Sequence, residues 1–383
     1  MVMIQDDLNR LDGIFIERAA RPPKTLSETM DSLKNRAILL YGAGVFGGES
    51  LEMFRHFGIE PVAFLDQAAA SGDTKMGIPV YPPHENALPK KLRENCLVYI
   101  SIVLPGRELR SIAEQLYEYG YRSVRSMQLL RAMRVPFEGI ESENPSDEWL
   151  LQRREQIAHG LLLMADEESR ETYLSCIRAH LLREYDNCIE TAFPVQYFDA
   201  GIPLRKKMSC LVDCGAYIGD SLVSALQCYN QIESYIGFEP IPESFRKLSK
   251  TVSQYNNRVR NAYLYPCGVA GQTEMAKFSV YASASAVTED EGEMLPVIRL
   301  DDVLKNVPVS FLKMDIEGME PMALRGAEQL IRQHSPDLAI CVYHAVNHYW
   351  EIPALIQKIN PRYRFYLRTH TPATMESVLY CTC

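Results

Sequence analysis

The sequence predicts an α/β protein built on two open, mostly parallel sheets. Two stretches share a layout of apolar strand, glycine loop and helix, namely "ILLYGAGVFGGESLEMF" (38–54) and "LVDCGAYIGDSLVSAL" (211–226). From residue 210 onward, apolar strands alternate with helical patterns, which is typical of a doubly wound sheet with helices on both faces. One cofactor does not explain both glycine loops, so the two units indicate two domains.

The first domain is expected over residues 31–135, after an N-terminal leader of residues 1–30. It has a βαβ start and reads as a small Rossmann-like module with about four strands. Its expected strands are 37–41, 61–66, 96–104 and 123–126, and its expected helices are 46–57 and 107–119.

Residues 136–195 are expected to form a linker and a helical bridge between the domains. The segment "VPFEGIESENPSDEWL" has the proline, glycine and acidic residues of a domain boundary. Ser146 is well placed as an N-cap, and residues 147–187 contain few helix breakers.

The second domain is expected over residues 196–383. Its parallel strands are predicted at 211–214, 235–239, 262–267, 309–315 and 338–344. A polar ribbon, "EMAKFSVYASASAV", interrupts the alternation after the third strand. The runs 363–370 and 377–383 are joined by a short turn with Pro372, which predicts a terminal hairpin with an antiparallel strand.

Composition narrows the classes of partner. The 383 residues carry a net charge of -9, which gives no reason to expect nucleic acid or anionic membrane as a partner. We expect a small-molecule substrate and leave open association with further copies of the chain. The ten cysteines lack regular spacing and no run of about 18 apolar residues occurs, so a reducing, cytoplasmic location is expected.

The first glycine loop contains a complete GxGxxG in Gly42, Gly44 and Gly47. Asp66 ends the following strand. Such glycines let the backbone approach a pyrophosphate at a helix N-terminus, while the acid binds a ribose. A possible nucleotide site therefore comprises these four residues. The alternative is that the glycines serve only a tight strand-to-helix turn.

The second glycine loop carries acids instead. The loop contains Asp213, Gly215, Gly219 and Asp220, and the next strand ends at Glu239. Carboxylates at a helix N-terminus repel a pyrophosphate but suit a ligand with positive charge, such as the sulfonium and ammonium of S-adenosylmethionine. Glu239 is then placed to accept both ribose hydroxyls. In the alternative reading the two aspartates only cap the loop.

Further polar residues follow the fourth and fifth predicted strands. Asp315 and Glu317 follow the fourth strand, and His344 follows the fifth, with His348 four residues later. The carboxyl ends of strands in an open α/β sheet form the edge that binds ligands.

The chain from 196 to 383 resembles the FkbM family of S-adenosylmethionine-dependent methyltransferases. The resemblance rests on several blocks in order: "QYFDAGIPL", "VDCGAYIGDS", "IGFEPIPESFRKL", "CGVAG", "LDD", "FLKMDIEGMEPMALRGA" and "LAICVYH". It implies a class I methyltransferase fold and methyl transfer to a hydroxyl oxygen of a carbohydrate or natural product. The N-terminal domain is similar to small Rossmann-like modules found beside sugar-modifying enzymes.

The resemblance also implies the cofactor contacts. It places the methionine part of S-adenosylmethionine at Asp213, Gly215, Ala216 and Gly219, the ribose at Glu239, and the adenine near Gly268 and Val269.

His344 is the first candidate for the base that removes the hydroxyl proton, because the unperturbed pKa of histidine lies near neutrality. Asp315 and Glu317 are expected to orient the acceptor. We expect no metal, although these two carboxylates and His344 could together hold a divalent cation. Strand-end carboxylates also cap helices, and a histidine after "CVY" can be a core residue. Glu320 is expected to support the loop.

Tyr197 and Phe198 line the acceptor pocket in one reading and pack in the core in the other. Two functions compete with methyl transfer. One is a nicotinamide-dependent or sugar-nucleotide-modifying enzyme that uses the Gly42 loop, although no Tyr-x-x-x-Lys pair follows that loop. The other is a non-catalytic module whose loops are structural or only sense a ligand.

Overall fold

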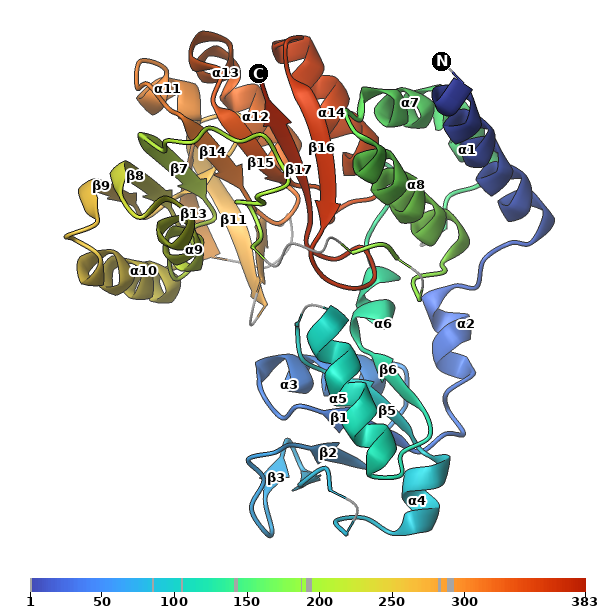
Figure 1. The fold of residues 1–383 in the computed structure, drawn as a ribbon. Coiled ribbons are helices and arrows are strands. Elements are labelled where there is room, and N and C mark those ends of the chain that lie inside the picture. The colour runs from blue at the N-terminus through green and yellow to red at the C-terminus, as the bar shows by residue number, and fades with distance from the viewer. Residues whose placement is uncertain are drawn as a thin grey trace.

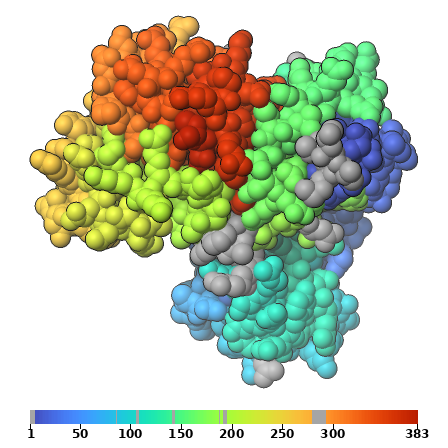
Figure 2. All heavy atoms as spheres, turned by 45° about the horizontal axis from the view of Figure 1, so that its top comes forward, coloured from blue at the N-terminus to red at the C-terminus, as the bar shows by residue number. Residues whose placement is uncertain are grey.

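The chain folds into two α/β domains, with a group of helices beside the larger one (Figure 1). The computed structural model describes residues 2–84, 86–104, 106–140, 144–186, 188–190, 195–281, 284–287 and 293–383. The N-terminal domain forms a separate lobe below the C-terminal domain, as the space-filling view shows (Figure 2). None of the helices described is long and apolar enough to cross a membrane.

The N-terminal domain contains a six-stranded sheet in the order β3-β4-β2-β1-β5-β6. Its strands are β1 (Ile38–Tyr41), β2 (Ala63–Leu65), β3 (Thr74–Lys75), β4 (Ile78–Tyr81), β5 (Leu97–Ile100) and β6 (Val124–Ser126). The four strands expected from the sequence are present. The expectation missed β3 and β4, because they are short and turn at Gly77 (φ 87°) without a long apolar run.

Four helices belong to this domain: α3 (Val45–His56), α4 (Lys90–Asn95), α5 (Gly106–Glu118) and α6 (Gln128–Ala132). Leu40 and Phe64 of the sheet pack with Phe54 of α3 in one apolar core, and Leu39 and Leu65 point into a second core on the other face. The domain thus has a core on each side of its sheet.

The segments on either side of this domain are helical. They form α1 (Val2–Ala20), α2 (Leu26–Asp31), α7 (Asp147–Leu163) and α8 (Glu167–Leu182). Among them α1, α7 and α8 pack on the C-terminal domain, whereas Leu26 and Met30 of α2 belong to the core of the N-terminal domain. Leu11 and Ile14 of α1 share a core with Tyr173 of α8. The Ser146 hydroxyl accepts a hydrogen bond from the Trp149 amide (3.1 Å), which confirms the expected N-cap.

The C-terminal domain contains a seven-stranded sheet in the order β16-β17-β15-β14-β7-β8-β9. Its strands are β7 (Cys210–Cys214), β8 (Ile232–Phe238), β9 (Val259–Tyr265), β14 (Phe311–Met314), β15 (Asp337–Cys341), β16 (Arg364–Thr369) and β17 (Ser377–Thr382). The first five are parallel, and β17 lies antiparallel between β15 and β16. The expected terminal hairpin is confirmed.

The polar ribbon after β9 belongs to a small second sheet in the order β10-β13-β11-β12. Its strands are β10 (Gly268–Val269), β11 (Glu274–Tyr281), β12 (Ala284–Val287) and β13 (Glu293–Ile298). The helices of this domain are α9 (Asp220–Tyr229), α10 (Pro242–Gln254), α11 (Leu300–Leu304), α12 (Glu320–Gly326), α13 (Glu328–His334) and α14 (His348–Ile359).

The strand order creates the position of the site. From β7 the chain proceeds to β8 and β9 on one side, and it later returns to β14 and β15 on the other side. Connections therefore diverge above the carboxyl ends of β7 and β14, and such a switch point leaves a crevice for a ligand. Along β7, Leu211 and Val212 point into cores on opposite faces of the sheet.

Candidate active site

A cavity of about 830 Å³ opens at the carboxyl ends of β7, β8 and β14, where the N-terminal domain faces the C-terminal sheet. Its volume lies within the range of small-molecule sites. It is lined by eight of the residues singled out from the sequence as cofactor or catalytic residues: Gly215, Asp220, Glu239, Gly268, Val269, Asp315, Glu317 and His344. Two sequence regions far apart in the chain, the second glycine loop and the strand ends after β14 and β15, are thus brought together.

Asp213, which was expected to contact the cofactor, is not among the residues that line this cavity. Its side chain is fully buried within β7. One carboxylate oxygen lies 3.1 Å from the Lys313 ammonium and the other accepts a hydrogen bond from the Tyr235 hydroxyl (2.9 Å). Its charge is therefore neutralised inside the sheet and does not face a ligand.

Lys313 is the partner that sequence reasoning missed. It lies opposite Asp213 in the register of β14 and β7, so both side chains share one face. Its ammonium also donates a hydrogen bond to the Gly215 carbonyl (2.7 Å). Burial alone would lower the pKa of Lys313, but the carboxylates of Asp213 and Asp315 outweigh burial and raise it. The signal was a lysine within the apolar strand "FLKM".

Two other predicted cofactor residues, Ala216 and Gly219, are buried behind the cavity wall. Gly219 has φ 89° and starts α9. A Cβ at Gly219 would lie 2.9 Å from Thr251. These two residues shape the loop, while the backbone of Gly215 reaches the cavity.

Gly215 requires glycine for two reasons. Its φ is 78°, which L side chains rarely adopt, and a Cβ there would lie 1.9 Å from the Asp315 carbonyl oxygen. The amides of Gly215 and Ala216 both donate to the Phe238 carbonyl (3.1 and 2.9 Å). The loop is thus fixed against the ends of both neighbouring strands.

Glu239 lies at the end of β8 and is nearly buried. Its two carboxylate oxygens accept hydrogen bonds from the amides of Tyr217 (2.9 Å) and Ile241 (2.8 Å). Burial raises the pKa of Glu239 to about 7, although these amides act in the opposite direction. The carboxylate is held in one orientation at the cavity wall, with lone pairs left for further donors.

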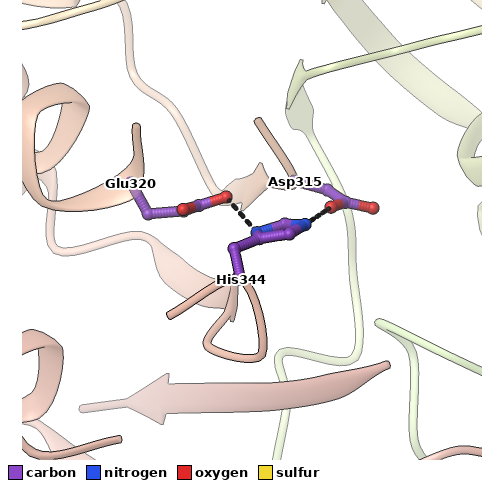
Figure 3. A group of neighbouring side chains, drawn as sticks. All are labelled: Asp315, Glu320 and His344. Atoms are coloured by element: carbon purple, nitrogen blue, oxygen red, sulfur yellow. Dashed lines mark hydrogen bonds and ion pairs between the residues drawn. The ribbon is translucent and has the colours of Figure 1, made fainter. Parts of the chain in front are cut away.

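His344 is surrounded by carboxylates (Figure 3). Its Nδ1 lies 3.0 Å from Glu320, which belongs to the start of α12. Its Nε2 lies 3.4 Å from both Asp315 and Glu317. Glu320 is fully buried and also accepts a hydrogen bond from the Ile316 amide (2.9 Å), so it supports the loop as expected.

The pKa of His344 differs from the value near neutrality that the sequence prediction assumed. Burial lowers the pKa of His344, but Glu320, Glu317 and Asp315 outweigh burial and raise it to about 10. The ring is therefore a cation at neutral pH and has no free lone pair to accept a proton. The sequence prediction of His344 as the base rested on a pKa near neutrality, and the carboxylates around the ring raise the pKa above that value.

Glu317 is better suited than His344 to accept a proton near neutral pH. Burial raises the pKa of Glu317 to about 7, near the value that suits a general base at neutral pH. The backbone of Glu317 adopts φ 56°, a left-handed conformation that is strained for any residue with a Cβ. Strained residues of this kind cluster at functional sites. The nearby Asp315 has its pKa lowered, because Lys313 and His344 outweigh burial, and stays ionised.

Of the aromatic pair expected near the acceptor, Tyr197 lines the cavity and Phe198 packs in the core. The Tyr197 hydroxyl donates a hydrogen bond to Asp315 (2.7 Å). Phe198 instead contacts the ring of Phe311 (centroids 5.2 Å apart). Both residues belong to one apolar core, and Tyr197 in addition reaches the cavity.

A metal-binding arrangement can be drawn from Asp315, Glu320 and His344, whose ligand atoms lie within 4.8 Å of one another. Glu320 takes the place that the sequence prediction gave to Glu317. Because His344 is itself protonated, it already supplies positive charge among the carboxylates. A divalent cation would have to displace that proton.

The first glycine loop lies away from this cavity wall. Gly42, Gly44, Gly47 and Asp66 are not among the lining residues. The Asp66 carboxylate accepts hydrogen bonds from the amides of Ala43 (2.8 Å) and Ala68 (2.9 Å), which ties the loop to β2. A Cβ at Gly47 would lie 2.0 Å from the Gly42 carbonyl oxygen, so this glycine is required by packing.

The remaining cavity wall comes from residues that the sequence did not point to. Arg131 and Arg134 reach it from the N-terminal domain, and Glu376 from the turn before β17. No local motif marks these positions, because the packing of the two domains brings Arg131 and Arg134 to the cavity and the turn of the terminal hairpin brings Glu376.

Comparison with known proteins agrees with this geometry. The family model described as "Methyltransferase FkbM domain" matches residues 213–366. These residues run from the end of β7 into β16 and include Asp315, Glu317, Glu320 and His344. A search of curated proteins finds no match.

Solved structures extend the likeness to the fold of the whole chain. Methyltransferase FkbM from Methylobacillus flagellatus KT aligns with 99% of this chain and 100% of its own, with a TM-score of 0.67 and 22% identity. The SAH-bound methyltransferase PaMTH1 from Podospora anserina (TM-score 0.28, 10% identity) aligns with 73% of this chain and 98% of its own. A precorrin-6y C5,15-methyltransferase from Geobacter metallireducens GS-15 (TM-score 0.29, 11% identity) covers 46% and 79% respectively. The family model thus matches most of the C-terminal domain, and the chain as a whole shares its fold with the FkbM methyltransferase from Methylobacillus flagellatus KT.

Proposed function

We propose that the protein is an S-adenosylmethionine-dependent O-methyltransferase that acts on a hydroxyl group of a carbohydrate or natural-product small molecule. The observation that carries the proposal is the acid-lined cavity at the switch point of the FkbM domain, with Glu239 and Asp220 on its wall. No observation favours the nicotinamide-dependent or the non-catalytic alternative.

The cavity residues fit the cofactor in chemistry. Asp220 at the start of α9 offers negative charge to an ammonium or sulfonium group, and Glu239 offers acceptors to ribose hydroxyls. Gly268 packs closely on Phe278, because a Cβ there would lie 3.0 Å from the ring. When bound, the cofactor supplies a methyl group on a good leaving group.

The chain's own residues then have to align the acceptor and remove its proton. Glu317 is the proposed base, because its pKa of about 7 lets a carboxylate take up a hydroxyl proton near neutral pH. His344 holds Glu317 and Asp315 in place as a cation. The Tyr197 hydroxyl orients Asp315 beside the acceptor.

Calorimetry with S-adenosylhomocysteine tests the cofactor assignment. The full chain is expected to bind it with one site. Glu239→Ala is expected to weaken binding by tenfold or more, since a hydrogen bond to a charged group contributes about 1.5–3 kcal/mol. Glu233→Ala, at the exposed start of the same strand, serves as the matched control and should bind as the wild type does. Absence of binding to the intact protein would refute the proposal.

Glu317→Gln tests the base separately. The variant should retain affinity for S-adenosylhomocysteine but lose at least about a hundredfold in turnover, the lower limit for general base catalysis. Full turnover in this variant would exclude Glu317 as the base while leaving the cofactor assignment intact.

A further inference from the structure

The cavity has walls of opposite charge. The carboxylates on its lining come from the C-terminal domain: Asp220, Glu239, Glu243, Asp315, Glu317 and Glu376. Arg131, at the end of α6, and Arg134 line it from the side of the N-terminal domain. The acidic wall suits a cationic cofactor, so the basic wall faces the space left for the acceptor.

The two arginines are available for a ligand, whereas the other cations of the lining are paired. Lys313 pairs with Asp213 (3.1 Å), and Lys247 pairs with Glu243 (2.8 Å). Among the residues that the structure describes, neither Arg131 nor Arg134 has a carboxylate partner.

The guanidinium group of Arg131 is also held in one orientation before any ligand binds. Its guanidinium carbon lies 4.6 Å from the centre of the Phe46 ring, and stacking of this kind restrains the plane of the group. Phe46 lies in the first turn of α3, between Gly44 and Gly47 of the first glycine loop. The first glycine loop therefore affects the cavity indirectly. It positions Phe46, on which Arg131 stacks, but its glycines do not line the cavity.

We propose that the methyl acceptor carries a phosphate group, which Arg131 and Arg134 bind at the interdomain wall while the hydroxyl to be methylated faces Glu317. A guanidinium matches a phosphate with two parallel hydrogen bonds, and two such groups favour a dianion over a neutral sugar. This inference rests on the proposed function, since it names the substrate class of the same cavity.

The test uses inorganic pyrophosphate as the probe, titrated calorimetrically into the full chain saturated with S-adenosylhomocysteine. The wild type should bind it, and the double variant Arg131→Ala/Arg134→Ala should lose about a hundredfold or more in affinity, at least tenfold for each arginine. Arg110→Ala, an exposed arginine on α5 outside the cavity, is the matched control and should bind as the wild type does. Equal affinity in the double variant, or no binding to the wild type, overturns the proposal.

Two controls separate the possible failures. Arg134→Glu changes one exposed side chain and keeps the Arg131 stack, so it tests the charge where the double variant fails to fold; unchanged pyrophosphate affinity would again overturn the inference. Binding of S-adenosylhomocysteine without pyrophosphate binding refutes this inference alone, whereas loss of S-adenosylhomocysteine binding by the wild type refutes the proposed function.

Turnover assays identify the source of the phosphate. A nucleoside-diphosphate sugar and a sugar phosphate are compared as acceptors, and methylation of either one, impaired in the double variant, supports the proposal. Methylation of a neutral oligosaccharide at the same rate by the wild type and by the double variant overturns it.

Discussion

Replacing Lys313 by Met tests whether the buried ion pair with Asp213 holds the cofactor loop. The substitution leaves the Asp213 carboxylate fully buried with the Tyr235 hydroxyl as its remaining partner. It also removes the hydrogen bond from Lys313 to the Gly215 carbonyl. Breaking a buried pair by removing one partner costs about 3–5 kcal/mol.

For a domain of this size, each kcal/mol lowers the melting temperature by about 2–4 °C. We therefore expect Lys313→Met to lower the melting temperature of the C-terminal domain by about 6–20 °C, measured by scanning calorimetry. Lys305→Met, at an exposed position after α11, is the control and should change the free energy of unfolding by less than about 0.5 kcal/mol.

The double variant Asp213→Leu/Lys313→Met removes both charges. Because a buried ion pair can often be replaced by apolar residues at little cost, it should be more stable than Lys313→Met alone. A cost below about 1 kcal/mol for Lys313→Met, or a double variant whose cost equals the sum of the two single ones, would refute the reasoning.

Three further outcomes follow from the site. The rate of methyl transfer should fall as the pH drops through about 7, where Glu317 becomes protonated, and fall again above about 10, where His344 loses its charge; a flat profile from pH 6 to 9 contradicts this. Gly215→Ala should weaken S-adenosylhomocysteine binding and lower stability by more than about 1 kcal/mol, because of its φ and the Asp315 carbonyl; unchanged calorimetric values would show that the loop can yield. EDTA should leave turnover unchanged; loss that one divalent cation restores would instead make Asp315 and His344 metal ligands.

Much of the fold could be predicted from local sequence. Runs of four to nine residues bounded by glycine loops and helices predicted most strands of the two large sheets, and two runs around Pro372 predicted the hairpin at the end. The strands β3 and β4 were missed because two- and four-residue strands carry too little periodicity.

The proposed cofactor side of the cavity was also largely predictable from the sequence, because its residues follow strand ends. Gly215, Asp220 and Glu239 reach the cavity for this reason. The ion pair of Asp213 was not predictable, since its partner Lys313 lies on a strand about a hundred residues later in the chain.

The sequence by itself determined where the strands end and which side chains follow them, because side chains at strand ends share one edge of a parallel sheet. Only the tertiary structure decided the charge states of the cavity residues and the part of the cavity wall that the N-terminal domain supplies. His344 became a cation because three carboxylates converge on it, and Glu317 gained a pKa near 7 through burial. Arg131 and Arg134 reached the cavity because two domains pack together, which no local pattern records.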